Sequence, residues 1–219
     1  MKLIIGNRNY SSWSLRAWLL LAWHRLEFDV VRIPLFAPGY RDKLLAYSPT
    51  GQVPVLVDDS LVVWDSLAIC EYVSERYLDG AGWPADREAR AEARSVSAEM
   101  HAGFAAIRQQ LPMNVRASGR QVAMNAALRG ETARVDSLWR DLRMRHRDRG
   151  PWLFGDFSIA DCLYVPMALR FVTYGIQLSA PAGDYLRTVA QQPLVQAWIA
   201  AAREEQETIG IAEVGIPPA

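Results

Sequence analysis

Short apolar runs and polar turns alternate over the first 78 residues, and their spacing predicts strands and helices in a mixed order. The β runs are residues 2–6 (KLIIG), 28–35 (FDVVRIPL), 53–59 (VPVLVDD) and 60–64 (SLVVW). The helical segments are residues 12–26, 40–49 and 65–77. Two strands joined through a helix pair in parallel, whereas two strands joined by a short turn pair antiparallel. The pattern therefore predicts a small α/β domain with both kinds of pairing.

The β pattern ends at a linker rich in Gly, Pro and Asp, residues 79–86. Beyond the linker only helical patterns remain. We expect helices over residues 87–111, 119–147, 158–174 and 193–206, the first ended by Pro112 and the third kinked at Pro166. The sequence thus predicts two domains, an α/β domain at 1–78 and an all-α domain at 87–219.

Composition narrows the function classes. Lys plus Arg equals Asp plus Glu at 24 each, so neither nucleic acid nor an anionic membrane is expected as the main partner. The run AWLLLAW is far shorter than the roughly 20 residues of a membrane-spanning helix, and no signal-peptide pattern is present. Cys70 and Cys162 stand in separate apolar contexts, which indicates buried free thiols and a cytoplasmic location. The chain has no CxxC motif and no His/Cys cluster, so no metal is expected.

Three polar motifs stand at the junctions of the α/β domain. They are the serine-rich turn from Ser11 to Ser14, the pair Val53-Pro54, and the pair Asp65-Ser66. Each has an ordinary structural interpretation. Serine caps helix N-termini, proline is tolerated where a strand begins, and Asp-Ser before an apolar run starts a helix.

Together and in this order, the motifs resemble those of the glutathione transferase family. YSSWSLRAW is most similar to the Ser-Ser-Cys-Ser-x-Arg motif of the zeta class, and GDFSIADCLYVP resembles the family's helix N-capping box, with Ser158 and Asp161. The resemblance covers nearly the whole chain. It implies a thioredoxin-like domain that binds reduced glutathione, a helical domain that completes the site for a small electrophile, and a homodimer.

The resemblance assigns a role to the hydroxyls of Ser11 and Ser12. Ser11 matches the family's catalytic serine and would donate a hydrogen bond to the glutathione thiolate, while Ser12 is an alternative or second donor. Lowering a thiol pKa by two units takes about 2.7 kcal/mol, which a hydroxyl-to-thiolate bond of roughly 1.5–3 kcal/mol and a helix N-terminus of about 0.3–1 kcal/mol can supply. Ser14 and Arg16 are expected to hold the turn.

The Val53-Pro54 and Asp65-Ser66 motifs would bind the other parts of glutathione. By resemblance, a cis bond between Val53 and Pro54 turns the backbone of Val53 outward to pair with the cysteinyl residue. Ser66 suits the γ-glutamyl carboxylate at a helix N-terminus, and Asp65 suits the ammonium. The candidates for the glycyl carboxylate are Lys43, Arg41 and Gln52, among which the sequence does not choose.

The electrophile is expected between the domains. Its candidate contacts are Trp13, Met100, His101, Phe104 and Arg108, the last four at helical spacing. Core packing is the alternative for Met100, whereas a buried charge is costly and favours the cleft for His101 and Arg108.

Three hypotheses for the function remain open. The first is a transferase that conjugates, isomerises or dehalogenates its substrate. The second is an enzyme like maleylacetoacetate isomerase, against which Trp13 argues because zeta-class isomerases have Cys at that place in the motif. The third is a non-catalytic glutathione-binding or assembly module.

Overall fold

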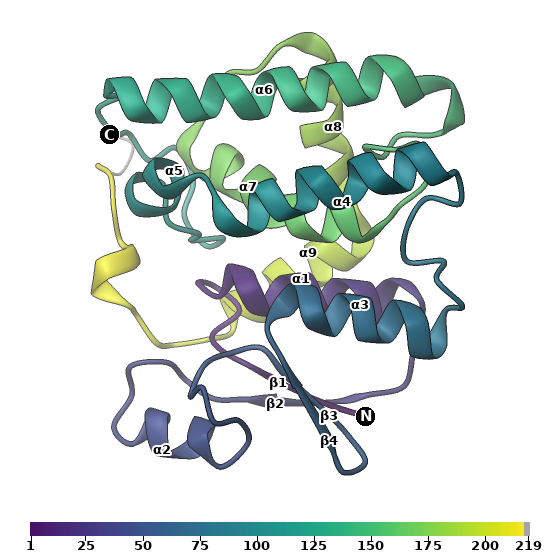
Figure 1. The fold of residues 1–219 in the computed structure, drawn as a ribbon. Helices are drawn as coiled ribbons and strands as arrows, with labels where there is room; N and C mark the ends of the chain where they lie inside the picture. Colours follow the sequence, from purple (N-terminus) through teal and green to yellow (C-terminus); the bar gives the residue numbers. More distant parts are fainter. Residues whose placement is uncertain (217–219) are drawn as a thin grey trace.

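The N-terminal part of the chain is a four-stranded sheet, seen in a computed structural model that describes residues 1–216 (Figure 1). Its strands are β1 (Lys2–Ile5), β2 (Asp29–Arg32), β3 (Val55–Asp58) and β4 (Leu61–Trp64), in the order β2-β1-β3-β4. β1 and β2 are parallel, and β3 is antiparallel to both β1 and β4. The predicted combination of a parallel crossover and an antiparallel hairpin is confirmed.

Helices cover both faces of this sheet. α1 (Ser12–Trp23) and α3 (Ser66–Tyr77) lie on one face and α2 (Tyr40–Leu45) on the other (Figure 1). Leu3 and Ile5 join the large core, while Ile4 packs in a small cluster with Leu44 of α2. Alternate residues of β1 are thus buried on opposite faces, as expected for a central strand covered on both sides.

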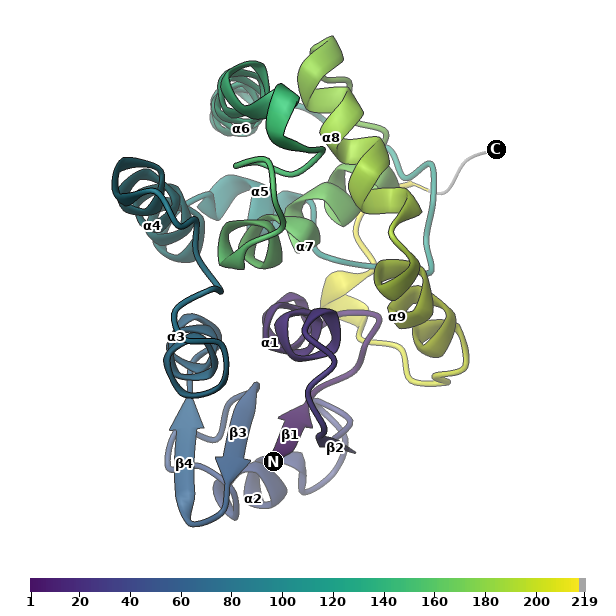
Figure 2. The ribbon, with the colours of Figure 1, turned by 90° about the vertical axis from the view of Figure 1, so that its right-hand side faces the viewer.

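The rest of the chain is helical. The helices are α4 (Arg87–Ala102), α5 (Ala105–Gln110), α6 (Ala126–His146), α7 (Ile159–Tyr174), α8 (Ala180–Gln191) and α9 (Pro193–Arg203), with short 3-10 turns at Arg147–Arg149 and Gly210–Ala212. Figure 2 shows α1 between the sheet and the helices α7 and α9. Because α1 packs against α3, α7 and α9, one continuous core joins the two parts of the chain.

Two helix predictions are wrong in part, and one helix was missed. The single helix expected over 87–111 is two helices, because Phe104 adopts a left-handed conformation (φ 60°) and is buried there. α6 begins at Ala126, where the side chain of Asn125 caps the helix, and not at residue 119 as predicted. α8 was not predicted at all. Its segment contains Pro181 and Gly183, which weaken the helical pattern of the sequence.

The predicted capping box starts α7. Asp161 Oδ2 accepts hydrogen bonds from the N–H of Ser158 at 2.9 Å and from its hydroxyl at 3.2 Å. Asp161 Oδ1 accepts a third bond from the N–H of Leu153 at 3.0 Å. The carboxyl is fully buried, and burial raises its pKa to about 6. Asp161 therefore ties the loop before α7 to the first turn of that helix.

Both cysteines are free and buried, as predicted. Burial raises the pKa of Cys70 to about 12 and that of Cys162 well above its ordinary value, so neither is a reactive thiolate. Within residues 1–216, no helix is both long and apolar enough to cross a membrane. The same residues contain no group of three or more His, Cys, Asp or Glu side chains placed to hold a metal ion.

Candidate functional site

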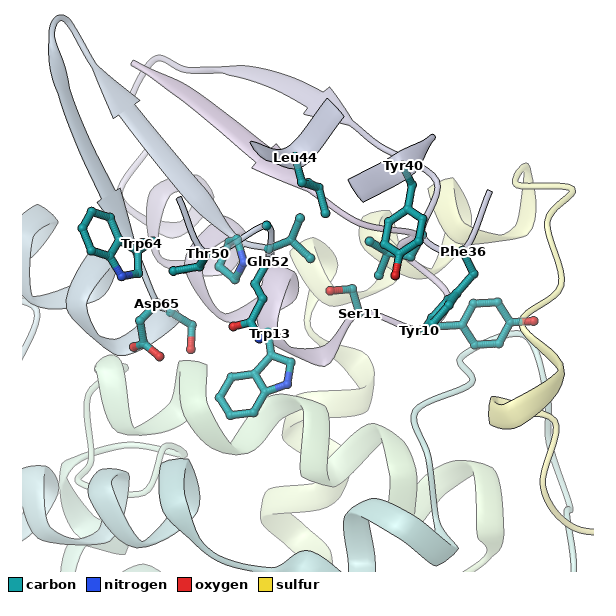
Figure 3. Close-up of a pocket in the computed structure, with 15 residues that line it drawn as sticks. Tyr10, Ser11, Trp13, Phe36, Tyr40, Leu44, Thr50, Gln52, Trp64 and Asp65 are labelled. Atoms are coloured by element: carbon teal, nitrogen blue, oxygen red, sulfur yellow. The ribbon is translucent and has the colours of Figure 1, made fainter. Parts of the chain in front are cut away.

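A cavity of about 680 Å³ opens where the first turns of α1 and α3 meet the loops around α2 and before β3 (Figure 3). Seven of the residues singled out from the sequence line it: Ser11, Trp13, Gln52, Val53, Pro54, Asp65 and Ser66. The other lining residues are Tyr10, Leu35, Phe36, Tyr40, Leu44, Thr50, Gly51 and Trp64. All of them belong to one stretch of the chain, from Tyr10 to Ser66.

Ser11 is the N-cap of α1, and a chain of hydrogen bonds orients its hydroxyl. Ser11 Oγ accepts a bond from the N–H of Ser14 at 3.3 Å and lies 2.7 Å from Ser14 Oγ. The buried Ser14 Oγ accepts the N–H of Gly6 at 3.1 Å and has no acceptor for its proton in residues 1–216 other than Ser11. We therefore assign Ser14 as the donor in the hydroxyl pair. Ser11 then accepts two bonds, and its own proton is free to be donated into the cavity.

Ser12 does not line the cavity. Its Oγ accepts a hydrogen bond at 3.1 Å from Nη2 of Arg170 on α7, and Arg170 Nη1 donates to the carbonyl of Leu111 at 2.6 Å. Burial lowers the pKa of Arg170 to about 9. Ser12 thus belongs to the contact between α1 and α7, which corrects its prediction as an alternative or second thiolate donor.

The backbone before β3 is open to a ligand. The Val53–Pro54 peptide bond is cis, as the resemblance predicted. Val53 lies outside β3 and lines the cavity, and its N–H and C=O have no backbone partner within residues 1–216. One residue of an extended peptide can therefore pair with Val53 as an added strand does.

Asp65 and Ser66 form the N-terminus of α3 at one end of the cavity. Asp65 has a φ of 73°, and its Oδ1 accepts the N–H groups of Leu67 at 2.8 Å and Ala68 at 3.2 Å. Its Oδ2 lies 3.2 Å from Nε2 of His101, whose pKa is lowered by desolvation. The backbone N–H of Ser66 is not among the amides that Asp65 caps, so this helix N-terminus keeps a donor for an anion.

Arg16 lies fully buried beside the cavity. Its Nη1 donates to Ser66 Oγ at 3.4 Å, and its Nε and Nη2 have no partner in residues 1–216. Burial lowers the pKa of Arg16 to about 9. A cation is therefore held behind the hydroxyl of Ser66, where it favours a negative charge at this end of the cavity.

Trp13 is packed among basic side chains. The guanidinium carbon of Arg16 lies 4.2 Å from the centre of the Trp13 ring, that of Arg108 lies 4.8 Å away, and the ring of His101 meets it edge-on at 5.2 Å. Arg108 donates to the carbonyls of Met100, Gly103 and His101 at the end of α4. Neither Arg108 nor His101 lines the cavity, so their prediction as electrophile contacts is not supported.

Other predicted contacts are also absent from the cavity wall. Met100 and Phe104 are 1% and 6% exposed and belong to the core. Lys43 and Arg41 are exposed on α2 and do not line the cavity. Of the three candidates for binding the glycyl carboxylate, Gln52 is the one that lines the cavity. Helical spacing identified an apolar face on α4 but could not distinguish a core face from a ligand face.

The sequence analysis missed an aromatic group on the other side of Ser11. Figure 3 shows Phe36 and Tyr40 on that side, opposite Gln52, Thr50 and Asp65. Phe36 lies in the loop between β2 and α2, and Tyr40 is the first residue of α2. The only signal was the presence of two aromatic rings in the short segment FAPGY, which is a weak one.

Comparisons with known proteins agree with this geometry. Residues 10–76 match the family described as "Glutathione S-transferase, N-terminal domain". The chain is 28% identical over 212 residues to a probable maleylacetoacetate isomerase from Caenorhabditis elegans, which covers 93% of this chain and 94% of that protein. It superposes on a glutathione transferase homolog from Burkholderia with bound glutathione (TM-score 0.70, 25% identity, 94% of this chain and 98% of the other). A bacterial zeta-class maleyl pyruvate isomerase has the same fold (TM-score 0.71, 22% identity, 94% and 100%).

Proposed function

We propose that the protein is a glutathione transferase of the family whose N-terminal domain residues 10–76 match, and that it activates the thiol of reduced glutathione with Ser11. The observation that carries the proposal is the meeting of three groups in one cavity. They are the hydroxyl of Ser11, whose proton is free when Ser14 is the donor in the hydroxyl pair, an unpaired backbone at Val53, and an open helix N-terminus at Ser66. A thiol, a peptide backbone and a carboxylate are the groups these three would bind.

Each part of glutathione has a partner in this proposal. The cysteinyl backbone pairs with Val53, and the γ-glutamyl carboxylate accepts the N–H of Ser66, with the charge of Arg16 behind it. The ammonium lies near Oδ2 of Asp65, which His101 orients from α4. The amide of Gln52 donates to the glycyl carboxylate.

The reaction follows from the orientation of Ser11. Its hydroxyl donates a hydrogen bond to the sulfur, so the thiol loses its proton to solvent at a lower pH than in water. The thiolate then forms a bond to an electrophilic carbon. A leaving group departs with its bonding electrons or, when the substrate is unsaturated, the neighbouring atom takes up a proton.

The direct test is a titration of the complex between pH 5 and 9, with glutathione binding measured by calorimetry and the thiolate by its ultraviolet band. We expect saturable binding and a thiolate that forms about two pH units below the 8.5 of a free thiol. Binding with an unshifted thiol would point to a non-catalytic module, and absence of binding would refute the proposal.

Replacing Ser14 with alanine tests the hydroxyl chain. Without Ser14 Oγ, Ser11 loses the bond that orients its proton, so we expect the pKa of bound glutathione to rise by about 0.5–1 unit. The affinity for glutathione should stay within about threefold, because Ser14 does not line the cavity. An unchanged thiol pKa, measured by the same titration, would show that Ser11 is oriented without Ser14.

The proposal also covers the domain organisation, the oligomeric state, the location, the role and a second candidate reaction. Residues 1–78 bind glutathione, residues 79–86 link the two parts, and the second domain spans 87–219, of which the structure describes 87–216. The protein acts as a homodimer, for which the exposed Leu61 and Trp64 on the edge strand β4 offer apolar surface. Two free buried thiols favour a location in the reducing cytoplasm, and detoxification is the role that fits conjugation.

The similarity to a probable maleylacetoacetate isomerase makes isomerisation the second candidate reaction.

A further inference from the structure

His101 contacts the proposed glutathione site from the helical part of the chain. It lies in the last turn of α4, and its Nε2 is 3.2 Å from Oδ2 of Asp65, at the N-terminus of α3. Figure 3 shows Asp65 on the same side of Ser11 as Gln52. Asp65 lines the cavity, whereas His101 does not. The imidazole therefore acts on a ligand in the cavity through the carboxylate of Asp65.

Oδ2 is the oxygen of Asp65 that a ligand can use. Oδ1 caps α3 by accepting the N–H groups of Leu67 and Ala68. Among the described residues, His101 is the side chain paired with Oδ2, and Asp65 is the single charged residue of the cavity wall. In the proposed function the γ-glutamyl ammonium also lies near Oδ2. The ammonium and the imidazole therefore share one acceptor.

A neutral imidazole is compatible with this sharing. Because Nε2 faces the carboxylate, we assign the proton of neutral His101 to Nε2, from which it is donated to Oδ2. Nδ1 is buried and has no hydrogen-bond partner in residues 1–216. A neutral donor leaves the negative charge of Asp65 in place, so that charge still attracts an ammonium.

A second proton on His101 changes the charge of the pair. The proton has to enter at Nδ1, and the contact with Asp65 then becomes an ion pair. The imidazolium neutralises the carboxylate and repels any cation that approaches Oδ2. Protonation of His101 and binding of an ammonium at Asp65 therefore oppose each other.

The surroundings of His101 keep it neutral near pH 7. The charged groups that face it from neighbouring elements are one anion and two cations, namely Asp65 of α3, Arg16 of α1 and Arg108 of α5. Trp13 packs edge-on against the imidazole, with ring centres 5.2 Å apart. Desolvation lowers the pKa of His101 below its ordinary 6.5, the carboxylate raises it, and both guanidinium groups lower it. His101 therefore gains its charge only in acid solution.

We propose that His101 is a positioning residue that makes the binding of the γ-glutamyl ammonium depend on pH. With a neutral imidazole, Asp65 attracts the ammonium. With a protonated one, the carboxylate is already paired and glutathione binds more weakly. This inference rests on the proposed glutathione site and adds a regulation of that site. The side chains of His101 and Asp65 are 27% and 42% exposed, so solvent screens the interaction and we expect an effect of about three- to tenfold.

The test measures the binding of S-methylglutathione by calorimetry between pH 8 and pH 5. This ligand has the ammonium and the thioether of a reaction product but no thiol, so ionisation of sulfur does not contribute. We expect its Kd to rise about three- to tenfold as the pH falls. The desamino analogue, in which hydrogen replaces the ammonium, should bind no more weakly at pH 5 than at pH 8. In His101→Gln, whose amide donates to Asp65 but does not titrate, the Kd of S-methylglutathione should not change with pH.

A second readout uses the wild-type protein. Binding and protonation affect each other equally, so S-methylglutathione should lower the pKa of His101 by about 0.5–1 unit. NMR titration of the imidazole signals measures this shift. The chain has three histidines, and His24→Gln and His146→Gln identify the other two signals. His24 caps the far end of α1 and His146 ends α6, and neither lines the cavity. Both variants should therefore keep the wild-type pH dependence of binding.

The outcomes separate this inference from the proposed function. If wild type binds S-methylglutathione equally well at pH 8 and pH 5, or if His101→Gln keeps the wild-type pH dependence, the role of His101 is refuted while the glutathione site stands. If His101→Gln does not fold, the NMR titration of wild type decides, and a pKa that stays the same or rises on binding overturns the proposal. If wild type does not bind S-methylglutathione at pH 8, the proposed function fails instead.

Discussion

Replacing Ser11 with alanine is expected to return the thiol of bound glutathione to a pKa near 8.5 and to lower kcat/KM at pH 6.5 by about 10–100-fold. Ser11 lines the cavity at the start of α1, and with Ser14 assigned as the donor in the hydroxyl pair the proton of Ser11 is free. Losing a hydrogen bond to a charged sulfur costs roughly 1.5–3 kcal/mol, or one to two pKa units. The thiolate band of the complex, followed from pH 5 to 9, measures the shift directly.

Ser12→Ala is the matched control for this experiment. Ser12 is adjacent in the chain, but its hydroxyl accepts a bond from Arg170 and does not line the cavity. We expect it to lower stability, because Arg170 loses a buried acceptor, and to leave the bound-thiol pKa unchanged. A raised pKa in Ser12→Ala with an unchanged one in Ser11→Ala would transfer the catalytic role to Ser12.

Replacing Asp161 with alanine is expected to lower the free energy of unfolding by about 2–4 kcal/mol at pH 7. The substitution leaves the N–H groups of Leu153 and Ser158 without their acceptor in the core. Asp161→Asn keeps one carbonyl oxygen as an acceptor, so it should lower the free energy of unfolding by about half as much as Asp161→Ala. Urea unfolding measures both, and Asp156→Ala, an exposed position in the same loop, should change stability by less than about 0.5 kcal/mol.

The pH dependence of this effect has a defined sign. Burial raises the pKa of Asp161 from an ordinary 3.8 to about 6, so the folded protein holds this proton more tightly than the unfolded chain. The stability gained from protonation is complete below 3.8 and is lost as the pH rises through about 6. Asparagine does not titrate. The advantage of wild type over Asp161→Asn should therefore shrink between pH 5 and pH 7, and an advantage that grows over this range would contradict the raised pKa.

Local patterns were sufficient for most of the fold. The parallel and antiparallel pairing of the N-terminal strands followed from the connections between them, and the start of α7 followed from the Ser158–Asp161 box. The break between α4 and α5 could not be predicted from local patterns, because it depends on a left-handed Phe104 whose ring is buried by tertiary contacts. Single-residue propensities carry no information about such a contact.

The candidate site was predictable where the chemistry is local. Ser11, Val53 and Ser66 were identified from motifs at chain junctions, and the structure places all three on one cavity. The rest of the cavity wall was not predictable, since helical spacing over residues 100–108 cannot tell which apolar face is filled by the core. Phe36 was missed because a loop residue has no periodicity, and its position depends on the bond between Leu35 and Asn7.

The confinement of the cavity wall to the stretch from Tyr10 to Ser66 has a consequence for the inheritance of specificity. Exchange of this one segment between related proteins would transfer the whole cavity wall at once. The helical part would be retained as a support, on the condition that it still supplies the basic side chains that contact Ser12 and Trp13. A cavity wall drawn from one segment can therefore be exchanged in one recombination step, whereas a wall shared between two domains would require changes in both.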